Sequence, residues 1–122
     1  MHALRQIHRA LVPGGLLVDM HPVPPSTRIE VRGESLGELD DTEFMGLVEA
    51  TEAPLAESEL FSFEEELEFD WLERFDSAEE LIETVSSWEW SEIPAKLVDR
   101  VREVRGPVDI WERVVLRRFR AT

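Results

Sequence analysis

Hydrophobic and polar positions repeat with two different periods along the chain, and each period predicts a type of element. Apolar side chains spaced three to four residues apart predict an amphipathic helix over residues 2–11. Strict alternation of apolar and acidic side chains predicts a strand over residues 60–72, with one buried and one solvated face. The same rules predict a strand at 16–18 buried on both faces, a hairpin at 27–39, a helix at 42–59, two helices within 77–104 and a last strand at 108–119.

Proline and glycine residues predict where these elements end. The run Pro13-Gly14-Gly15 should terminate the first helix, because neither residue type continues a helix at low cost. Pro54 should kink or locally break the helix at 42–59. Three further prolines should stop the strand that begins near residue 16: Pro22, Pro24 and Pro25.

Short polar residues mark the starts of three helices. Ser77 and Glu80 form the S-x-x-E pattern of a capping box. Ser91 is expected to cap the helix that follows, and the run Asp40-Asp41-Thr42 supplies capping candidates for the helix at 42–59. Strands interleaved with helices predict an α/β or α+β layered fold, in a single domain over residues 1–122.

Composition excludes several classes of protein. The 122 residues contain no cysteine, which excludes disulfides and thiolate metal sites. The net charge of −14 disfavours nucleic acid and anionic membrane surfaces, so we expect neither as a partner. No apolar run reaches the roughly 18 residues of a membrane helix, and no signal-peptide pattern opens the sequence. We therefore expect a cytoplasmic protein.

Most acidic residues lie in the middle of the chain, whereas the last segment is basic. The carboxylates that alternate along the strand at 60–72 are numerous enough to suggest a Ca²⁺ or Mg²⁺ site. However, a strand spreads its ligands along a line, so we expect a solvated face that is neutralised by arginines of the last strand. The carboxylates are Glu64, Glu66, Glu68 and Asp70, and the arginines are Arg113, Arg117, Arg118 and Arg120.

Residues 9–19 read Arg-Ala-Leu-Val-Pro-Gly-Gly-Leu-Leu-Val-Asp. This segment resembles the turn of class I S-adenosylmethionine-dependent methyltransferases in which a helix ends in R-x-L-x-P-G-G and leads into the fifth strand. In that family a helix, a sixth strand and an antiparallel seventh strand complete the sheet, often with helices inserted before the seventh. The elements expected at 42–59, 60–72, 77–104 and 108–119 follow that order. The resemblance implies a partial Rossmann-like sheet of mixed strands with an antiparallel last strand, flanked by helices.

The resemblance covers only the C-terminal half of the family fold. The family binds its cofactor through a G-x-G-x-G turn after the first strand and an acidic residue at the end of the second strand, and no G-x-G occurs in this sequence. We therefore expect no cofactor on the isolated chain. S-adenosylmethionine is expected only if a partner chain supplies the N-terminal half.

The resemblance also predicts association. The family's fifth strand pairs with a fourth strand that has no counterpart here, so the strand at 15–20 should expose an apolar edge beside an uncovered sheet face. We expect an obligate oligomer, in its simplest form a homodimer through residues 4–20. A partner chain that supplies the missing strands is the alternative. A monomer would require the hairpin at 27–39 to fold back over the edge.

Two side chains are candidates for catalysis. His21 follows the carboxyl end of the strand that begins near residue 16, where ligands of open α/β sheets bind. Asp19 lies two residues earlier on the same side, so the pair could act as a general base. Alternatively, His21 begins a surface loop. We expect no metal site, since His2 and His8 lie on different faces of a helix.

Three functions remain open from the sequence. The first is a truncated methyltransferase-like protein without autonomous catalysis, acting as an oligomeric structural or interaction module. The second is half of an S-adenosylmethionine-dependent methyltransferase that another chain completes. The third is a small acidic ligand-binding protein with a pocket between the inserted helices and the sheet, lined by Trp88, Trp90 or Trp71.

Overall fold

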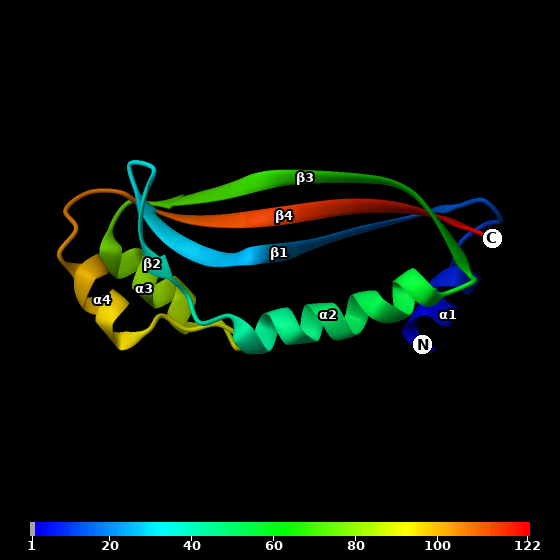
Figure 1. Cartoon of the computed structure of the whole chain (residues 1–122), viewed down its shortest axis with the longest axis horizontal. Helices are drawn as coiled ribbons and strands as arrows, with labels where there is room; N and C mark the ends of the chain where they lie inside the picture. The colour runs from blue at the N-terminus through cyan, green and yellow to red at the C-terminus, as the bar shows by residue number, and fades with distance from the viewer. Residues whose placement is uncertain (1) are drawn as a thin grey trace.

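Three long strands run along the molecule, and helices lie along one side of them (Figure 1). The computed structural model describes residues 2–122, in which helices and strands come in the order expected from the hydrophobic pattern. The elements are α1 (His2–Ala10), β1 (Leu16–Val31), β2 (Glu34–Glu38), α2 (Thr42–Glu57), β3 (Phe61–Phe75), α3 (Ala78–Ser86), α4 (Ala95–Arg102) and β4 (Val108–Ala121).

The strands form one sheet in the order β2-β1-β4-β3, and every neighbouring pair is antiparallel. The expectation of a mixed sheet is therefore wrong for adjacent strands. The reason is that β4 lies between β1 and β3. These two strands run in the same direction, but they are not hydrogen-bonded to each other. The chain has a mixed α/β fold with a four-stranded antiparallel sheet flanked by helices.

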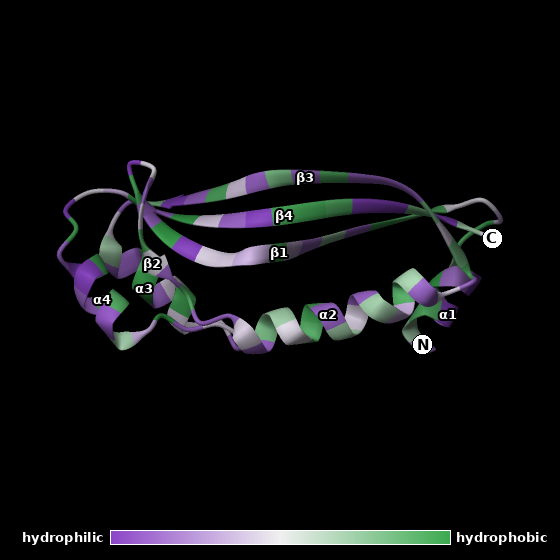
Figure 2. Ribbon diagram, in the orientation of Figure 1, coloured by the Kyte–Doolittle hydropathy of each residue, from purple (hydrophilic) through white to green (hydrophobic). Residues whose placement is uncertain are grey.

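Two hydrophobic cores lie at opposite ends of the sheet. Val108 and Ile110 of β4 belong to the larger core under α3 and α4, whereas Phe119 and Ala121 belong to a smaller core with α1 and α2. Side chains alternate along a strand, so these even and odd positions lie on opposite faces of β4. Long twisted strands allow this arrangement, in which each face is covered at one end only. Figure 2 shows a short hydrophobic stretch in the middle of β4, with hydrophilic residues on both sides of it.

Strand β1 differs from its prediction in two ways. It continues through the three prolines to Val31, with an irregularity in its pairing with β4 between Val23 and Arg28. The prolines are tolerated because two of them lie within that irregularity and because β2 pairs only with Arg28–Val31. The strand is also not buried on both faces, since Leu16 and Val18 are 45% and 57% exposed where no layer covers them.

Strand β3 contains a bulge that the sequence pattern does not reveal. Its pairing with β4 shifts between Phe63 and Glu65. Before the shift, the Phe63 ring packs edge-to-face on Phe119, with ring centroids 5.8 Å apart. After the shift, Leu67 lies opposite Leu116 on the other face. The apolar side chains of β3 therefore divide between two faces, and the predicted single buried face is wrong: Leu67 is 58% exposed.

The helix boundaries confirm some signals and correct others. Ser77 Oγ accepts a hydrogen bond from the Glu80 backbone N–H at 3.2 Å, as the capping-box pattern predicts. Helix α2 is not broken at Pro54 but continues to Glu57. Ser91 does not cap the next helix, because residues 91–94 are extended and α4 begins only after Pro94.

Candidate functional site

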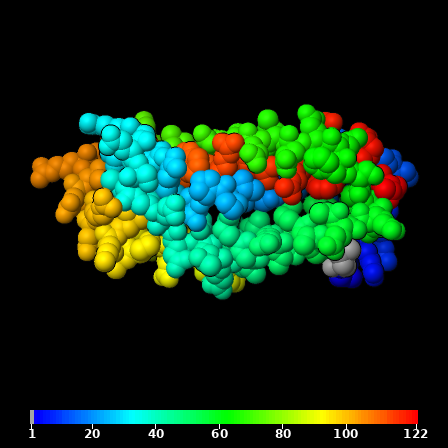
Figure 3. Space-filling model, viewed as in Figure 1, coloured from blue at the N-terminus to red at the C-terminus, as the bar shows by residue number. Residues whose placement is uncertain are grey.

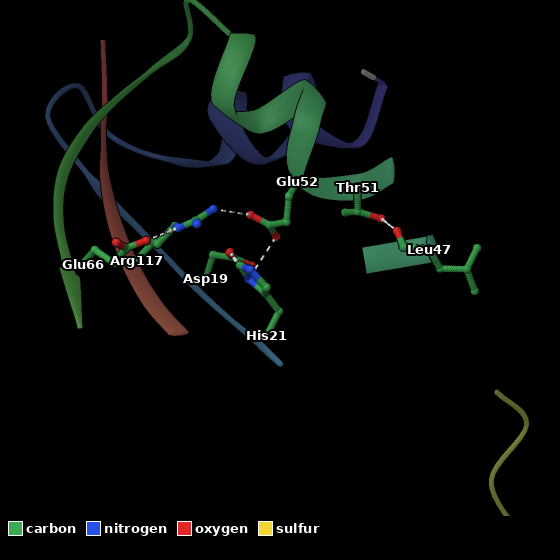
Figure 4. Close-up of polar contacts among 7 residues, drawn as sticks. All are labelled: Asp19, His21, Leu47, Thr51, Glu52, Glu66 and Arg117. Carbon is green, nitrogen blue, oxygen red and sulfur yellow. Dashed lines mark hydrogen bonds and ion pairs between the residues drawn. The ribbon is translucent and has the colours of Figure 1, made fainter. Parts of the chain in front are cut away.

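Strand β1 and helix α2 bring two carboxylates and one imidazole together on the side of the sheet that α2 occupies (Figure 4). His21 Nδ1 lies 2.8 Å from Asp19 Oδ2 and 3.3 Å from Glu52 Oε1. In the tautomer with a proton on Nδ1, the imidazole donates to Asp19. The sequence predicted that Asp19 and His21 share one side of a strand. It did not point to Glu52, which completes the group.

The local structure explains why these three side chains meet. Asp19 and His21 are two residues apart in a strand, so both point to the same face. Glu52 lies one helical turn from Val48 and from Leu55, which is buried in the smaller core, so it occupies a position that faces the sheet. A carboxylate on the inward face of a helix was the signal in the sequence that could have identified Glu52.

Burial makes the group electrostatically unusual. The side chains of His21, Glu52 and Asp19 are 9%, 14% and 22% exposed. Burial and the neighbouring Asp19 carboxylate raise the pKa of Glu52 from 4.5 to about 7, although Arg117 acts in the opposite direction. A carboxyl group with such a pKa exchanges its proton near neutral pH, which is a property of general acids and bases.

Arg117 of β4 is the cation nearest to the group, but it is divided between two carboxylates. Its Nη1 lies 3.5 Å from Glu52 Oε2, while its Nε lies only 2.7 Å from Glu66 Oε1. Figure 4 shows the guanidinium between the two acids, on the side of Glu52 away from His21. Arg117 therefore orients Glu52 without neutralising the Asp19–Glu52 pair.

An open groove lies beside the group, between β1 and α2. Its volume is about 680 Å³, and its walls include Pro24, Met45 and Glu49 as well as His21 and Glu52. In the space-filling view, α2 lies beside β1 in the middle of the molecule (Figure 3). A small ligand or water can therefore reach the imidazole from the groove.

The tryptophan pocket expected from the sequence is present only in part. Trp88 and Trp90 line two shallow hollows, of about 470 and 430 Å³, next to α3 and the N-terminal end of α2. Trp71 lines neither hollow and is exposed on β3. Trp88 also packs against the larger core, which is the anchoring role common for buried aromatic residues.

The carboxylates of β3 pair with arginines of the last strand, as predicted, but on both faces of the sheet and not on one. Arg113 and Arg117 lie on the face that α2 occupies, and Arg118 and Arg120 lie on the other face. Arg113 binds Glu68 and Asp70, and the other arginines continue the pattern along β4. The remaining pairs are Arg117 with Glu66, Arg118 with Glu64 and Glu65, and Arg120 with Glu64. These side chains thus form an ion-pair ladder.

The acidic run before α2 acts locally. Asp40 Oδ1 accepts a hydrogen bond from the Thr42 backbone N–H, at the start of the helix. Buried Asp41 accepts from the Thr27 backbone N–H at 3.1 Å instead of capping the helix with its side chain. Asp41 therefore ties the start of α2 to β1.

Comparison with known proteins adds no constraint. The chain matches no protein-family model, no curated protein and no solved structure. Among residues 2–122, no helix combines the length and the apolar character needed to cross a membrane.

Proposed function

We propose that this chain is a methyltransferase-like half-sheet that functions as an association module, and that it forms a homodimer through residues 4–20. One observation carries the proposal: a row of apolar side chains on the sheet is left exposed, beside the ion pairs that Arg118 and Arg120 form on the same face. Met20, Leu116 and Leu67 lie directly opposite one another on β1, β4 and β3 and so form one row across the sheet. The exposed apolar side chains of this surface are Leu16, Val18, Met20, Leu67 and Trp71.

The apolar side chains of this surface are enough to offset the cost of association. Completing the burial of one half-exposed side chain of this kind is worth about 1 kcal/mol. Five such side chains on each of two copies therefore contribute about 10 kcal/mol, which is comparable to the estimated cost of association of about 4–15 kcal/mol. An apolar surface is also complementary to itself, as a two-fold interface requires.

The first helix contributes less to this surface than the strand does. Leu4 and Leu11 pack against the smaller core of their own chain, which includes Phe61 and Phe119. The proposed contact within residues 4–20 is therefore centred on Leu16, Val18 and Met20 of β1.

The solution mass of charged variants tests the proposal. We expect the wild-type chain to sediment as a dimer at micromolar concentration and the double variant Val18→Lys/Met20→Lys to sediment as a monomer. Leu47→Lys is the matched control, because Leu47 is an exposed apolar side chain on α2, outside the proposed interface. Leu67→Lys tests the same surface from β3. Far-UV circular dichroism checks that each variant is folded. A wild-type chain that sediments as a single 14.1 kDa species contradicts the proposal.

Strand order favours a second candidate function, namely half of an S-adenosylmethionine-dependent methyltransferase completed by another chain. β4 is antiparallel to β1, as the seventh strand of that family is to the fifth. Residues 16–23 of β1 pair with β4, and within residues 2–122 no strand lies on their other edge, where the family places its fourth strand.

Calorimetry with S-adenosylmethionine separates the two candidates. The association module predicts no binding heat from the homodimer. Micromolar binding by the isolated chain contradicts both candidates as stated, because both expect the chain alone to lack a cofactor site. Binding that appears only with a second polypeptide paired along residues 16–23 supports the second candidate.

A further inference from the structure

We propose that Asp19, His21 and Glu52 form a binding site for a first-row divalent metal ion, with Zn²⁺ as the best fit. One donor atom of each side chain lies within 4.8 Å of the other two. A tetrahedral ion with bonds of about 2.0–2.2 Å holds its ligand atoms roughly 3.3 Å apart. The observed separations of His21 Nδ1 from the two carboxylate oxygens are 2.8 and 3.3 Å. Small side-chain movements therefore bring all three donors onto one ion, provided that Nδ1 gives up its proton and the neutral ring carries its proton on Nε2.

The donor set indicates the class of metal. One imidazole nitrogen with two carboxylate oxygens suits borderline ions such as Zn²⁺, whereas Mg²⁺ and Ca²⁺ prefer oxygen ligands alone. Copper(I) and iron–sulfur clusters are disfavoured because the chain has no cysteine. In the series of first-row divalent ions, Zn²⁺ should bind more tightly than Mn²⁺.

The surroundings supply what a metal site needs beyond three ligands. Arg117 approaches Glu52 Oε2, which leaves Oε1 directed at His21. Arg117 is itself held by Glu66, so the orientation of the ligand carboxylate is fixed from outside the site. The groove of about 680 Å³ provides an entry path and room for water or a substrate atom in the fourth position.

Charge also favours a cation over a purely internal hydrogen-bond network. Two carboxylates face one imidazole within a largely buried group, and the nearest arginine is shared with Glu66. A dication between Asp19 and Glu52 would balance both charges at once. The proposed site lies on the α2 side of β1, opposite the association surface, so it does not depend on the proposed dimer.

Zinc titration of the full chain, first stripped with a chelator, tests the site. We expect isothermal titration calorimetry with Zn²⁺ to show one ion per chain. Glu52→Gln and Asp19→Asn keep the shape of the side chain but remove a charged ligand, and each should weaken binding at least about tenfold. Glu49→Gln is the matched control, because Glu49 lies on the same helix and lines the same groove outside the three donors.

A second measurement separates this site from ions held loosely by the acidic surface. In NMR spectra with Zn²⁺, the ring signals of His21 should shift before those of His2 and His8. Binding that is equal in Glu52→Gln and Glu49→Gln overturns the proposal, as does a shift confined to His2 or His8. Absence of Zn²⁺ binding by the folded wild-type chain also overturns it.

Discussion

Asp109 at the start of β4 is a buried carboxylate that depends on one partner. Arg74 of β3 binds it with two hydrogen bonds, of 2.9 and 3.2 Å. Replacing Arg74 by Met should leave the Asp109 carboxylate unpaired, and an unsatisfied buried group of this kind costs about 1–3 kcal/mol or more. Urea denaturation measures the loss. Arg113→Met is the control, because its partners Glu68 and Asp70 are exposed and should hydrate at little cost. Equal losses in the two variants would contradict this account.

Glu112 gives the stability of the protein a pH dependence of known sign. Burial, with the nearby Glu73 and Asp41 carboxylates, raises its pKa above 4.5. The folded state therefore holds the Glu112 proton more tightly than the unfolded state does. Its contribution to the free energy of unfolding should fall as pH rises above about 4.5. Glu112→Gln should remove this decrease, so the variant gains stability relative to wild type as pH rises.

Glu64 is the control, because its contribution to stability should change with pH in the opposite direction to that of Glu112. The hydrogen bond from Arg120 lowers its pKa, so its stabilising effect is present above 4.5 and is lost as pH falls. Glu64→Gln should therefore lose stability relative to wild type as pH rises. Denaturation curves for both variants, taken from well below pH 4.5 to neutral pH, test the two signs, because the Glu64 effect changes below 4.5 and the Glu112 effect above it. Parallel pH profiles would refute them.

Two glycines give opposite predictions for the elements that contain them. Gly33, in the turn between β1 and β2, has a φ of +82°, and Gly46 lies inside α2 with open space around it. Gly33→Ala should destabilise by about 1–2 kcal/mol because an L side chain strains that conformation. Gly46→Ala should stabilise by about 0.5–1 kcal/mol because alanine favours the helix. Thermal denaturation of both variants measures the difference, and a gain of stability in Gly33→Ala would be incompatible with the turn described.

The elements were predictable from periodicity where apolar residues keep a regular spacing along one face, as in α1 and α3. The irregularities in β1 and β3 could not be predicted, because they depend on how these strands pair with β4. The bulge between Phe63 and Glu65 leaves the alternating pattern of β3 unchanged in sequence, while it moves later apolar side chains to the other face. The passage of β1 through Pro24 and Pro25 likewise depends on the local interruption of its ladder with β4.

The candidate site was predictable only within one element. Asp19 and His21 follow from strand geometry, since they are two residues apart. Glu52 comes from an element 31 residues further along the chain than His21, and only the packing of α2 on β1 brings it to 3.3 Å from the imidazole. Local patterns carry no information on such a distance.

At the scale of the whole molecule, each face of the sheet is covered at one end only. The larger core covers one face beneath α3 and α4, and the smaller core covers the other beside α1 and α2. The exposed surface around Val18, Met20 and Leu67 lies on the same face as the larger core, beyond the end that α3 and α4 cover.

An apolar interface should also tolerate salt, so the dimer should persist or strengthen as ionic strength rises and screens the net charge of −14. Sedimentation at low and high salt checks this, since an ionic interface would dissociate instead.

The most direct test of the association module is the solution mass of the wild-type chain at micromolar concentration. Sedimentation equilibrium is the method of choice because it needs no assumption about the shape of an elongated molecule. We expect twice the chain mass of 14.1 kDa. A single species at 14.1 kDa, unchanged as the concentration is raised, would contradict it.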